Sequence, residues 1–233
     1  MWGVPMAIVA FLGWQLLRNT FMLDPYRRID PQVAALRIEA VAMNWKWLFN
    51  YPEQGIATVD HLAIPLGTLV EFRLTSDSVM HSFMISALAG QIHVMPGVET
   101  RQFLRADLPG DYIGRTKQYN GPGFAGQRFV VSAVEAAAFE TWVAETRDRG
   151  GALDKTAYAI LAEPSTGAAA AQRLGLPAGA PIGFGQVQPD LYASILHRYM
   201  SPAGVPAAVQ GGAPAYAGAT GASPHHHETG SAP

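Results

Sequence analysis

The side chains in this sequence that could do chemistry are chiefly histidines, which bind metals or carry protons near neutral pH. His81 could be a metal ligand, but we expect it to be a neutral, hydrogen-bonded strand histidine. His93 and Met95 form a soft-ligand pair that copper favours. Alternate residues of a strand, however, usually do no more than share one face of a sheet. The run His225–His227 could bind Cu²⁺ or Ni²⁺ weakly.

Other kinds of chemistry have less support in this 233-residue chain. It contains no cysteine, which excludes disulfides, thiolate nucleophiles, iron–sulfur clusters and every copper centre that depends on a thiolate. Asp77 and Glu99 could act as an acid–base pair, yet nothing indicates a substrate pocket, so we expect surface or turn carboxylates. The formal net charge of −2 excludes a strongly basic nucleic-acid binder.

Residues 1–23 predict a helix that crosses a membrane. Residues 1–17 contain no charged residue, and a helix continued to residue 23 would span roughly 34 Å, enough for a bilayer core of about 30 Å. Arg18 would reach the interface along its aliphatic stem. Arg18, Arg27 and Arg28 follow the apolar run, and the positive-inside rule would place what comes next in the cytoplasm.

After a Pro-containing linker over residues 24–34, the hydrophobic pattern changes to the alternation of β-strands. Many short strands, separated by Pro and Gly turns, predict an antiparallel sandwich or small barrel over residues 35–134. Trp45 and Trp47 would share one strand face, as core or subunit-contact residues. The expected strands cover residues 37–41, 45–49, 61–64, 69–74, 81–85, 91–94, 100–106, 111–114 and 127–133.

The pattern becomes helical over residues 135–200. One helix would run from residue 135 to about residue 147, and a second would begin at Asp190, acting as its N-cap, and continue to residue 200. The first helix would present one apolar face, made by Phe139, Trp142 and Val143.

Two further segments of the C-terminal half have a biased composition. Residues 163–188 are rich in Pro, Gly and Ala and indicate a connection between the two helices. Residues 201–233 contain 20 Ala, Gly or Pro among 33 positions, which predicts a disordered tail because such a segment cannot bury a core.

Two parts of the sequence resemble subunit II of the haem–copper oxidases: the run Ser76–Phe83 with the following Met95–Gly97, and the run Pro109–Gly114. This resemblance implies a mainly β protein with a cupredoxin-like Greek-key β-sandwich. In the copper-bearing branch, the sandwich holds the dinuclear copper A centre. Its ligand pattern is a His and, after 34 residues, Cys-x-Glu-x-Cys-x3-His-x2-Met. Laid on this chain without a gap, the pattern falls on His81, Thr116, Gln118, Asn120, Phe124 and Gln127.

Of the six ligand residues, the first histidine alone is retained, at His81. The bridging thiolates that would hold two coppers together are replaced, and a hydroxyl, two amides and a phenyl ring cannot hold a mixed-valence copper pair. We therefore expect no metal site, no cofactor and no catalytic residue in this chain.

The runs Asn44–Val59, Tyr119–Gly126 and Gln188–Met200 are similar to the branch that lacks copper A, the cytochrome bo-type ubiquinol oxidase subunit II. The resemblance covers about residues 4–200. It implies a non-catalytic subunit of a proton-pumping complex that oxidises ubiquinol and reduces oxygen to water. Subunit I would carry the haems, CuB and the quinol chemistry, and this chain would be a structural cap on it.

The resemblance also implies a location and partners. The complex would lie in the bacterial inner membrane with the globular domain in the periplasm, opposite to the topology that the arginines indicate. Subunit I, further integral membrane subunits and lipid would be the partners, with no nucleic acid and no cytochrome c. The family has two transmembrane helices, so this chain would begin within the second. The alternative is a stand-alone, membrane-anchored, cupredoxin-like binding module.

Overall fold

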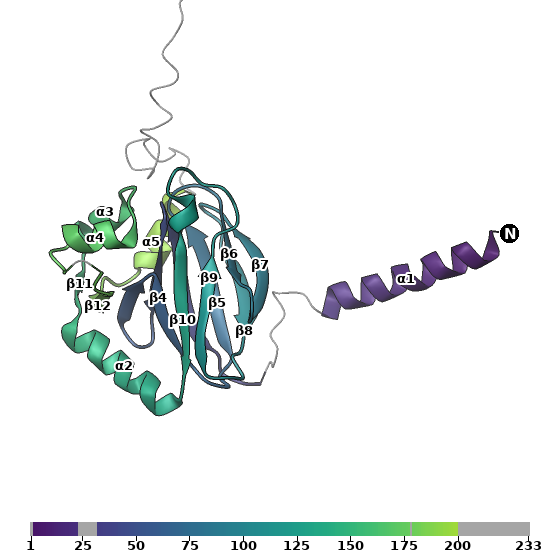
Figure 1. Ribbon diagram of the computed structural model, residues 1–233, viewed down its shortest axis with the longest axis horizontal. Helices are drawn as coiled ribbons and strands as arrows, with labels where there is room; N and C mark the ends of the chain where they lie inside the picture. The colour runs from purple at the N-terminus through teal and green to yellow at the C-terminus, as the bar shows by residue number, and fades with distance from the viewer. Residues whose placement is uncertain (1, 23–31, 178, 200–233) are drawn as a thin grey trace, which may run out of the picture.

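The centre of the protein is a sandwich of two β-sheets, shown in a computed structural model that describes residues 2–22, 32–177 and 179–199 (Figure 1). Strand β5 (Val70–Ser76) illustrates why the sequence folds this way. Val70, Phe72 and Leu74 are buried, whereas Glu71 and Arg73 between them are half-buried. Successive side chains of a strand point to opposite faces, so this alternation gives one apolar face to the core.

The larger sheet has seven strands within the described residues, in the order β11-β12-β3-β2-β1-β5-β8. Strands β1 and β2 form an antiparallel hairpin, and β1 also pairs in parallel with β5. The other strands of this sheet are β1 (Leu36–Met43), β2 (Lys46–Tyr51), β3 (Ile56–Val59), β8 (Thr100–Leu104), β11 (Gly151–Leu153) and β12 (Ile182–Val187).

The smaller sheet has the order β4-β10-β9-β6-β7, again within the described residues. An aromatic cluster fills the space between the two sheets. The rings of Trp47, Phe49, Phe83 and Phe129 pack in stacked, tilted and edge-to-face pairs, with ring centroids 5.1–6.4 Å apart. The mainly β sandwich is therefore confirmed. The strands of this sheet are β4 (His61–Pro65), β6 (His81–Ile85), β7 (Ala89–Val94), β9 (Gly110–Arg115) and β10 (Arg128–Val134).

The C-terminal helices are also confirmed, and α2 buries Phe139 and Val143 as predicted. The prediction of a connection over residues 163–188 is wrong in part. This segment contains α4 and strand β12, and β12 pairs with β3. Asp190 is the N-cap residue of α5 as predicted, but its backbone is left-handed (φ 58°) and its side chain makes no capping hydrogen bond. The helices are α2 (Ala136–Arg149), α3 (Lys155–Ala162), α4 (Gly167–Arg173) and α5 (Leu191–Arg198).

The N-terminal helix α1 (Gly3–Met22) forms as predicted and has no buried residue. Within the described parts of the chain, no helix is both long and apolar enough to cross a membrane, so the predicted crossing over residues 1–23 is not confirmed. Most of the expected linker, and the expected disordered tail over residues 201–233 with His225–His227, lie outside the described residues.

Candidate functional site

His81 is the first residue of β6 and is fully buried. Its Nδ1 lies 2.7 Å from the carbonyl oxygen of Val79, so the Nδ1–H donates to that oxygen. Burial lowers the pKa of His81 to about 4, although the backbone of Val79 and Met43 opposes this shift, because a protonated ring would place a charge in the core. The ring is therefore neutral near pH 7.

Thr116 and Gln118 stand where the copper A pattern has its first cysteine and its glutamate. The Trp47 Nε1–H donates to Thr116 Oγ1 at 3.2 Å. The backbone N–H of Gln118 donates to Ser82 Oγ at 3.0 Å. These bonds attach the segment after β9 to β2 and β6, so it lies beside His81 as the pattern predicts.

Asn120 and Gln127 stand in place of the second cysteine and the methionine, and they bind each other. The Asn120 Nδ2–H donates to Gln127 Oε1. Gln127 is buried, and its Nε2 donates to the carbonyl oxygens of Met43 (3.2 Å) and Lys46 (3.4 Å) in the β1–β2 turn. The amide pair thus joins the segment after β9 to the β1–β2 hairpin by hydrogen bonds alone.

Phe124 replaces the second histidine and begins a short 3₁₀ helix, η1 (Phe124–Gly126). Its ring is half-buried and lies 5.7 Å from the ring of Tyr119. A phenyl ring offers no lone pair to a metal.

The donor set does not fit a copper pair. Among the six positions, the imidazole of His81 has its Nδ1–H bound to a carbonyl, and the Thr116 hydroxyl and the side-chain amides of Asn120 and Gln127 are engaged with protein partners. Copper centres of this kind need thiolates. Among the residues described, no three His, Asp or Glu side chains group together in a way that could hold a metal ion. No electron-transfer step can be derived through this site.

Trp45 covers the same segment from the β1–β2 turn. Its Nε1–H donates to the carbonyl of Asn120 at 3.4 Å, and a Cβ added at Gly123 would lie 2.1 Å from its ring. The prediction that Trp45 and Trp47 share one strand face is wrong. Trp45 has φ 68° and belongs to the turn, whereas Trp47 is buried in the core.

Asp77 lies in the bend between β5 and β6, as expected for a turn carboxylate, but it is buried and does not lie on the surface. Arg198 Nη1 lies 2.9 and 3.0 Å from its two carboxylate oxygens, and the hydroxyls of Tyr158 and Tyr199 also donate to them. Burial raises the pKa of Asp77, against the effect of these three partners. Glu99 has a different partner, Arg101 Nε at 3.0 Å, so the two carboxyls do not form an acid–base pair.

Lys46 is a second buried charge that the sequence interpretation missed; its position between two tryptophans was the available signal. Its Nζ donates to the carbonyl oxygens of Glu163 and Ser165, each at 2.9 Å. Burial lowers the pKa of Lys46 to about 8, and the nearby Asp60 opposes this shift. Burial raises the pKa of Asp60 to about 7. The ammonium group ties the β1–β2 hairpin to the segment between α3 and α4.

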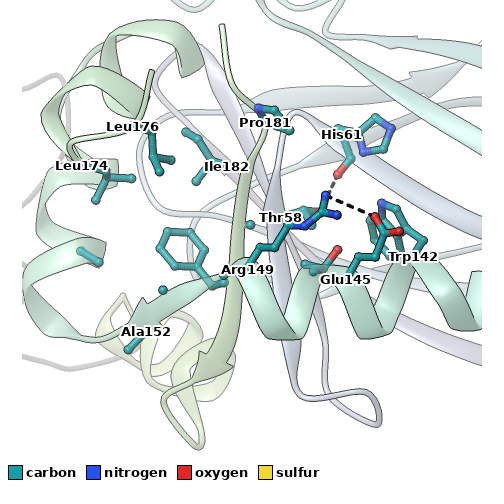
Figure 2. A pocket seen from close by; sticks show the side chains of 16 residues that line it. Thr58, His61, Trp142, Glu145, Arg149, Ala152, Leu174, Leu176, Pro181 and Ile182 are labelled. Carbon is teal, nitrogen blue, oxygen red and sulfur yellow. Dashed lines mark hydrogen bonds and ion pairs between the residues drawn. The ribbon is translucent and has the colours of Figure 1, made fainter. Parts of the chain in front are cut away.

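A groove of about 400 Å³ lies elsewhere, between α2 and β12. Figure 2 shows Arg149 and Glu145 of α2 facing it opposite Leu174, Leu176 and Ile182. Its polar groups contact each other, with Arg149 Nη1 3.4 Å from a Glu145 carboxylate oxygen. The groove includes none of the six copper A positions, so the candidate site is the loop end around His81.

Known proteins are similar to most of this chain. No protein-family model matches the chain. The cytochrome bo(3) ubiquinol oxidase subunit 2 of Pseudomonas putida is 40% identical over 198 residues, which make up 85% of this chain and 60% of that protein. The ubiquinol oxidase subunit 2 of Acetobacter aceti is 39% identical over 201 residues, covering 85% of this chain and 61% of that protein. Over most of its length the chain is homologous to ubiquinol oxidase subunit 2. The resemblance found in the sequence is thereby confirmed.

The chain spans about 60% of the length of these relatives. Among solved structures, the periplasmic domain of subunit II of cytochrome oxidase from Bradyrhizobium japonicum is similar to 50% of this chain and 96% of its own length, with 23% identity and a TM-score of 0.47.

Proposed function

We propose that the chain is the non-catalytic subunit 2 of a proton-pumping ubiquinol oxidase. In this complex it caps subunit I on the periplasmic side of the bacterial inner membrane. Subunit I carries the haems and CuB, oxidises ubiquinol and reduces oxygen to water, and further integral membrane subunits and lipid complete the complex. This chain binds no cofactor and contributes assembly and stability.

The observation that carries the proposal is the hydrogen-bonded pair of Asn120 and Gln127 at two copper A positions. Cytochrome c is a water-soluble one-electron donor, so an oxidase that uses it needs a relay on the soluble side. Ubiquinol is dissolved in the lipid and can reach a haem of subunit I directly. A subunit 2 without copper A suits a quinol oxidase and not a cytochrome c oxidase.

The structural role is supported by the hydrogen bonds and ion pairs at the end of the sandwich where the copper A positions lie. The amides of Asn120 and Gln127, the ammonium of Lys46 and the guanidinium of Arg198 each join segments far apart in the chain. Hydrogen bonds to charged groups are among the stronger ones in proteins. This end of the sandwich therefore has a fixed structure that needs no metal.

The test is a mild-detergent pull-down of the tagged full chain from its native membranes. The haem spectrum of the eluate is recorded, together with oxygen uptake driven by ubiquinol and, separately, by reduced cytochrome c. We expect a haem-bearing complex that is active with ubiquinol alone. Activity with cytochrome c would contradict the proposed route of electron entry. An eluate without haem would favour the stand-alone, membrane-anchored binding module.

A further inference from the structure

A second groove, of about 370 Å³, lies between the outer face of the larger sheet and the start of α5. We call it the α5 groove. One row of polar residues across three neighbouring strands lines it: Asn50 of β2 pairs with Glu39 of β1, and Glu39 pairs with Arg73 of β5. The chain neighbours of all three belong to the core between the sheets, so their own side chains point to the outer face.

Two buried polar atoms on the α5 groove have no hydrogen-bond partner within the described residues. They belong to Asn50, which is 9% exposed, and to Tyr192 of α5, which is 6% exposed. The Asn50 Nδ2–H donates to Glu39 Oε2 at 2.6 Å, so Asn50 Oδ1 points away from that carboxylate. Neither this oxygen nor the Tyr192 hydroxyl is bonded. Buried polar atoms in native proteins are nearly always hydrogen-bonded, and these two therefore point to a ligand.

The surroundings of these atoms are negative. Burial raises the pKa of Tyr192, and the charges of Glu99 and Glu39 raise it further. The phenol is therefore neutral near pH 7, and its oxygen can accept a hydrogen bond from a bound group. Burial also raises the pKa of Glu39, against the effect of the hydrogen bond from Asn50. A cation beside Glu39 would stabilise its ionised form.

The charges that line the α5 groove favour a cation. Among the residues described, four charged side chains line it: Glu39, Glu99, Asp190 and Arg73. Three more adjoin these: Arg37, Glu71 and Arg101. Carboxylates outnumber guanidiniums by two among the lining groups, and by one when the adjoining groups are included. A ligand that carries phosphate, such as a phospholipid headgroup, would meet repulsion here.

An organic cation fits the α5 groove better than a metal ion does. Within the described parts of the chain, no three His, Asp or Glu side chains group together in a way that could hold a metal ion. Part of the groove wall is apolar, made by Pro52, Val187, Leu191 and Leu196. A primary ammonium has three N–H donors, which match the acceptors on Glu39, Asn50 and Tyr192. The carbon chain of an amine would contact the apolar wall.

We propose that the α5 groove binds a small aliphatic amine, with one ammonium group held by the Glu39 carboxylate, Asn50 Oδ1 and the Tyr192 hydroxyl. The excess of carboxylates favours a diamine, whose second ammonium lies toward Glu99 or Asp190. The inference does not depend on the proposed function, because it requires neither haem nor a companion subunit.

The test is calorimetric titration of the tagged full chain, purified in mild detergent with the subunits that accompany it, using 1,4-diaminobutane at pH 7. We expect a Kd below about 1 mM. Glu39→Gln keeps an oxygen that can accept from Asn50 but removes the charge, and it should raise the Kd by about tenfold or more. Tyr192→Phe removes an oxygen that has no partner among the described residues, and it should raise the Kd by about threefold or more.

Glu145→Gln is the matched control, because Glu145 is a carboxylate on the other groove, between α2 and β12. It should leave the Kd unchanged. The uncharged probe 1,4-butanediol has the same chain length and should not bind.

Absence of diamine binding to the parent, or an equal Kd for the parent and Glu39→Gln, would overturn the inference. Equal binding of 1,4-butanediol would do so as well, because the ammonium would then not be recognised. Displacement of the diamine by MgCl₂ with an affinity that depends on Glu39 would assign the groove to a metal ion and also overturn it. Urea unfolding reports the folding of each variant, and if Glu39→Gln unfolds earlier than the parent, Glu99→Gln replaces it under the same criteria.

Discussion

Arg198, in the last turn of α5, holds both carboxylate oxygens of Asp77, which lies 121 residues earlier in the chain. The Asp77 side chain is almost completely buried, whereas Arg198 keeps about a quarter of its surface exposed. The guanidinium also lies 5.8 Å from the centre of the Tyr158 ring. The C-terminal helices are thereby fastened to the loop that leads into His81.

Arg198→Ala should therefore destabilise the protein by about 3 kcal/mol, because it leaves a buried carboxylate without its cation. Denaturant unfolding of the full chain measures the change in the free energy of unfolding. The control is Arg105→Ala, which removes an exposed ion pair with Asp107 (2.9 Å) and should change stability by no more than about 1 kcal/mol. Equal effects of the two substitutions would contradict the assigned role of Arg198.

The burial of Asp77 also shows what local sequence patterns leave open. The run from Ser76 to His81 has the composition of an exposed turn, and the partners of Asp77 are supplied by α3 and by the residues at the end of α5. Strands such as β5 were predictable because their alternation is local. Strand β12 was not, because two glycines interrupt its apolar residues and its pairing partner β3 lies far away in the sequence.

The candidate site could be predicted in outline. The spacing taken from the oxidase resemblance brings Thr116, Gln118, Asn120 and Gln127 to the end of the sandwich where His81 lies. The hydrogen bonds within the site could not be predicted, because the partners of a side-chain amide depend on the three-dimensional positions of the groups around it. The turn conformation of Trp45 could not be predicted either, because the alternate tryptophans Trp45 and Trp47 are typical of a strand.

Gly123→Ala should disturb the site by displacing Trp45. The added Cβ would lie 2.1 Å from the indole ring, and overpacking of this kind costs about 1–3 kcal/mol. Gly126→Ala is the matched control, because no atom lies within 4 Å of its added Cβ. The measurements are the unfolding free energy and the tryptophan emission spectrum. An equally small change for both variants would show that Trp45 does not pack on Gly123.

His81 should make stability depend on pH in the acid range. Its pKa is about 4 in the folded state, against 6.5 for an unperturbed histidine, so between these values the unfolded state holds a proton that the native state does not. Stability therefore falls as the pH falls from about 6.5 to 4, by roughly 2.5 × 1.36, or about 3 kcal/mol.

Unfolding of the parent and of His81→Gln, measured at several pH values, isolates this contribution from that of His61, whose pKa burial also lowers. His81→Gln should reduce the slope of the unfolding free energy against pH, because about one fewer proton is taken up on unfolding. If the profile of His81→Gln ran parallel to that of the parent, the His81 ring would take up its proton at the same pH in the native and the unfolded state, contrary to the prediction.

Lys46→Met should loosen the segment between α3 and α4 without changing the shape of the hairpin. Methionine fills a similar volume, but the carbonyls of Glu163 and Ser165 lose the ammonium that binds them at 2.9 Å. Hydrogen bonds to a charged group are worth about 1.5–3 kcal/mol, so a loss of about 2 kcal/mol is expected. Hydrogen exchange should become faster first over residues 163–166, the segment between α3 and α4 that the ammonium binds. Lys155→Met, at an exposed lysine, should leave exchange there unchanged. Unchanged exchange with Lys46→Met would show that other contacts hold the segment, and that the buried ammonium does not join it to the β1–β2 hairpin.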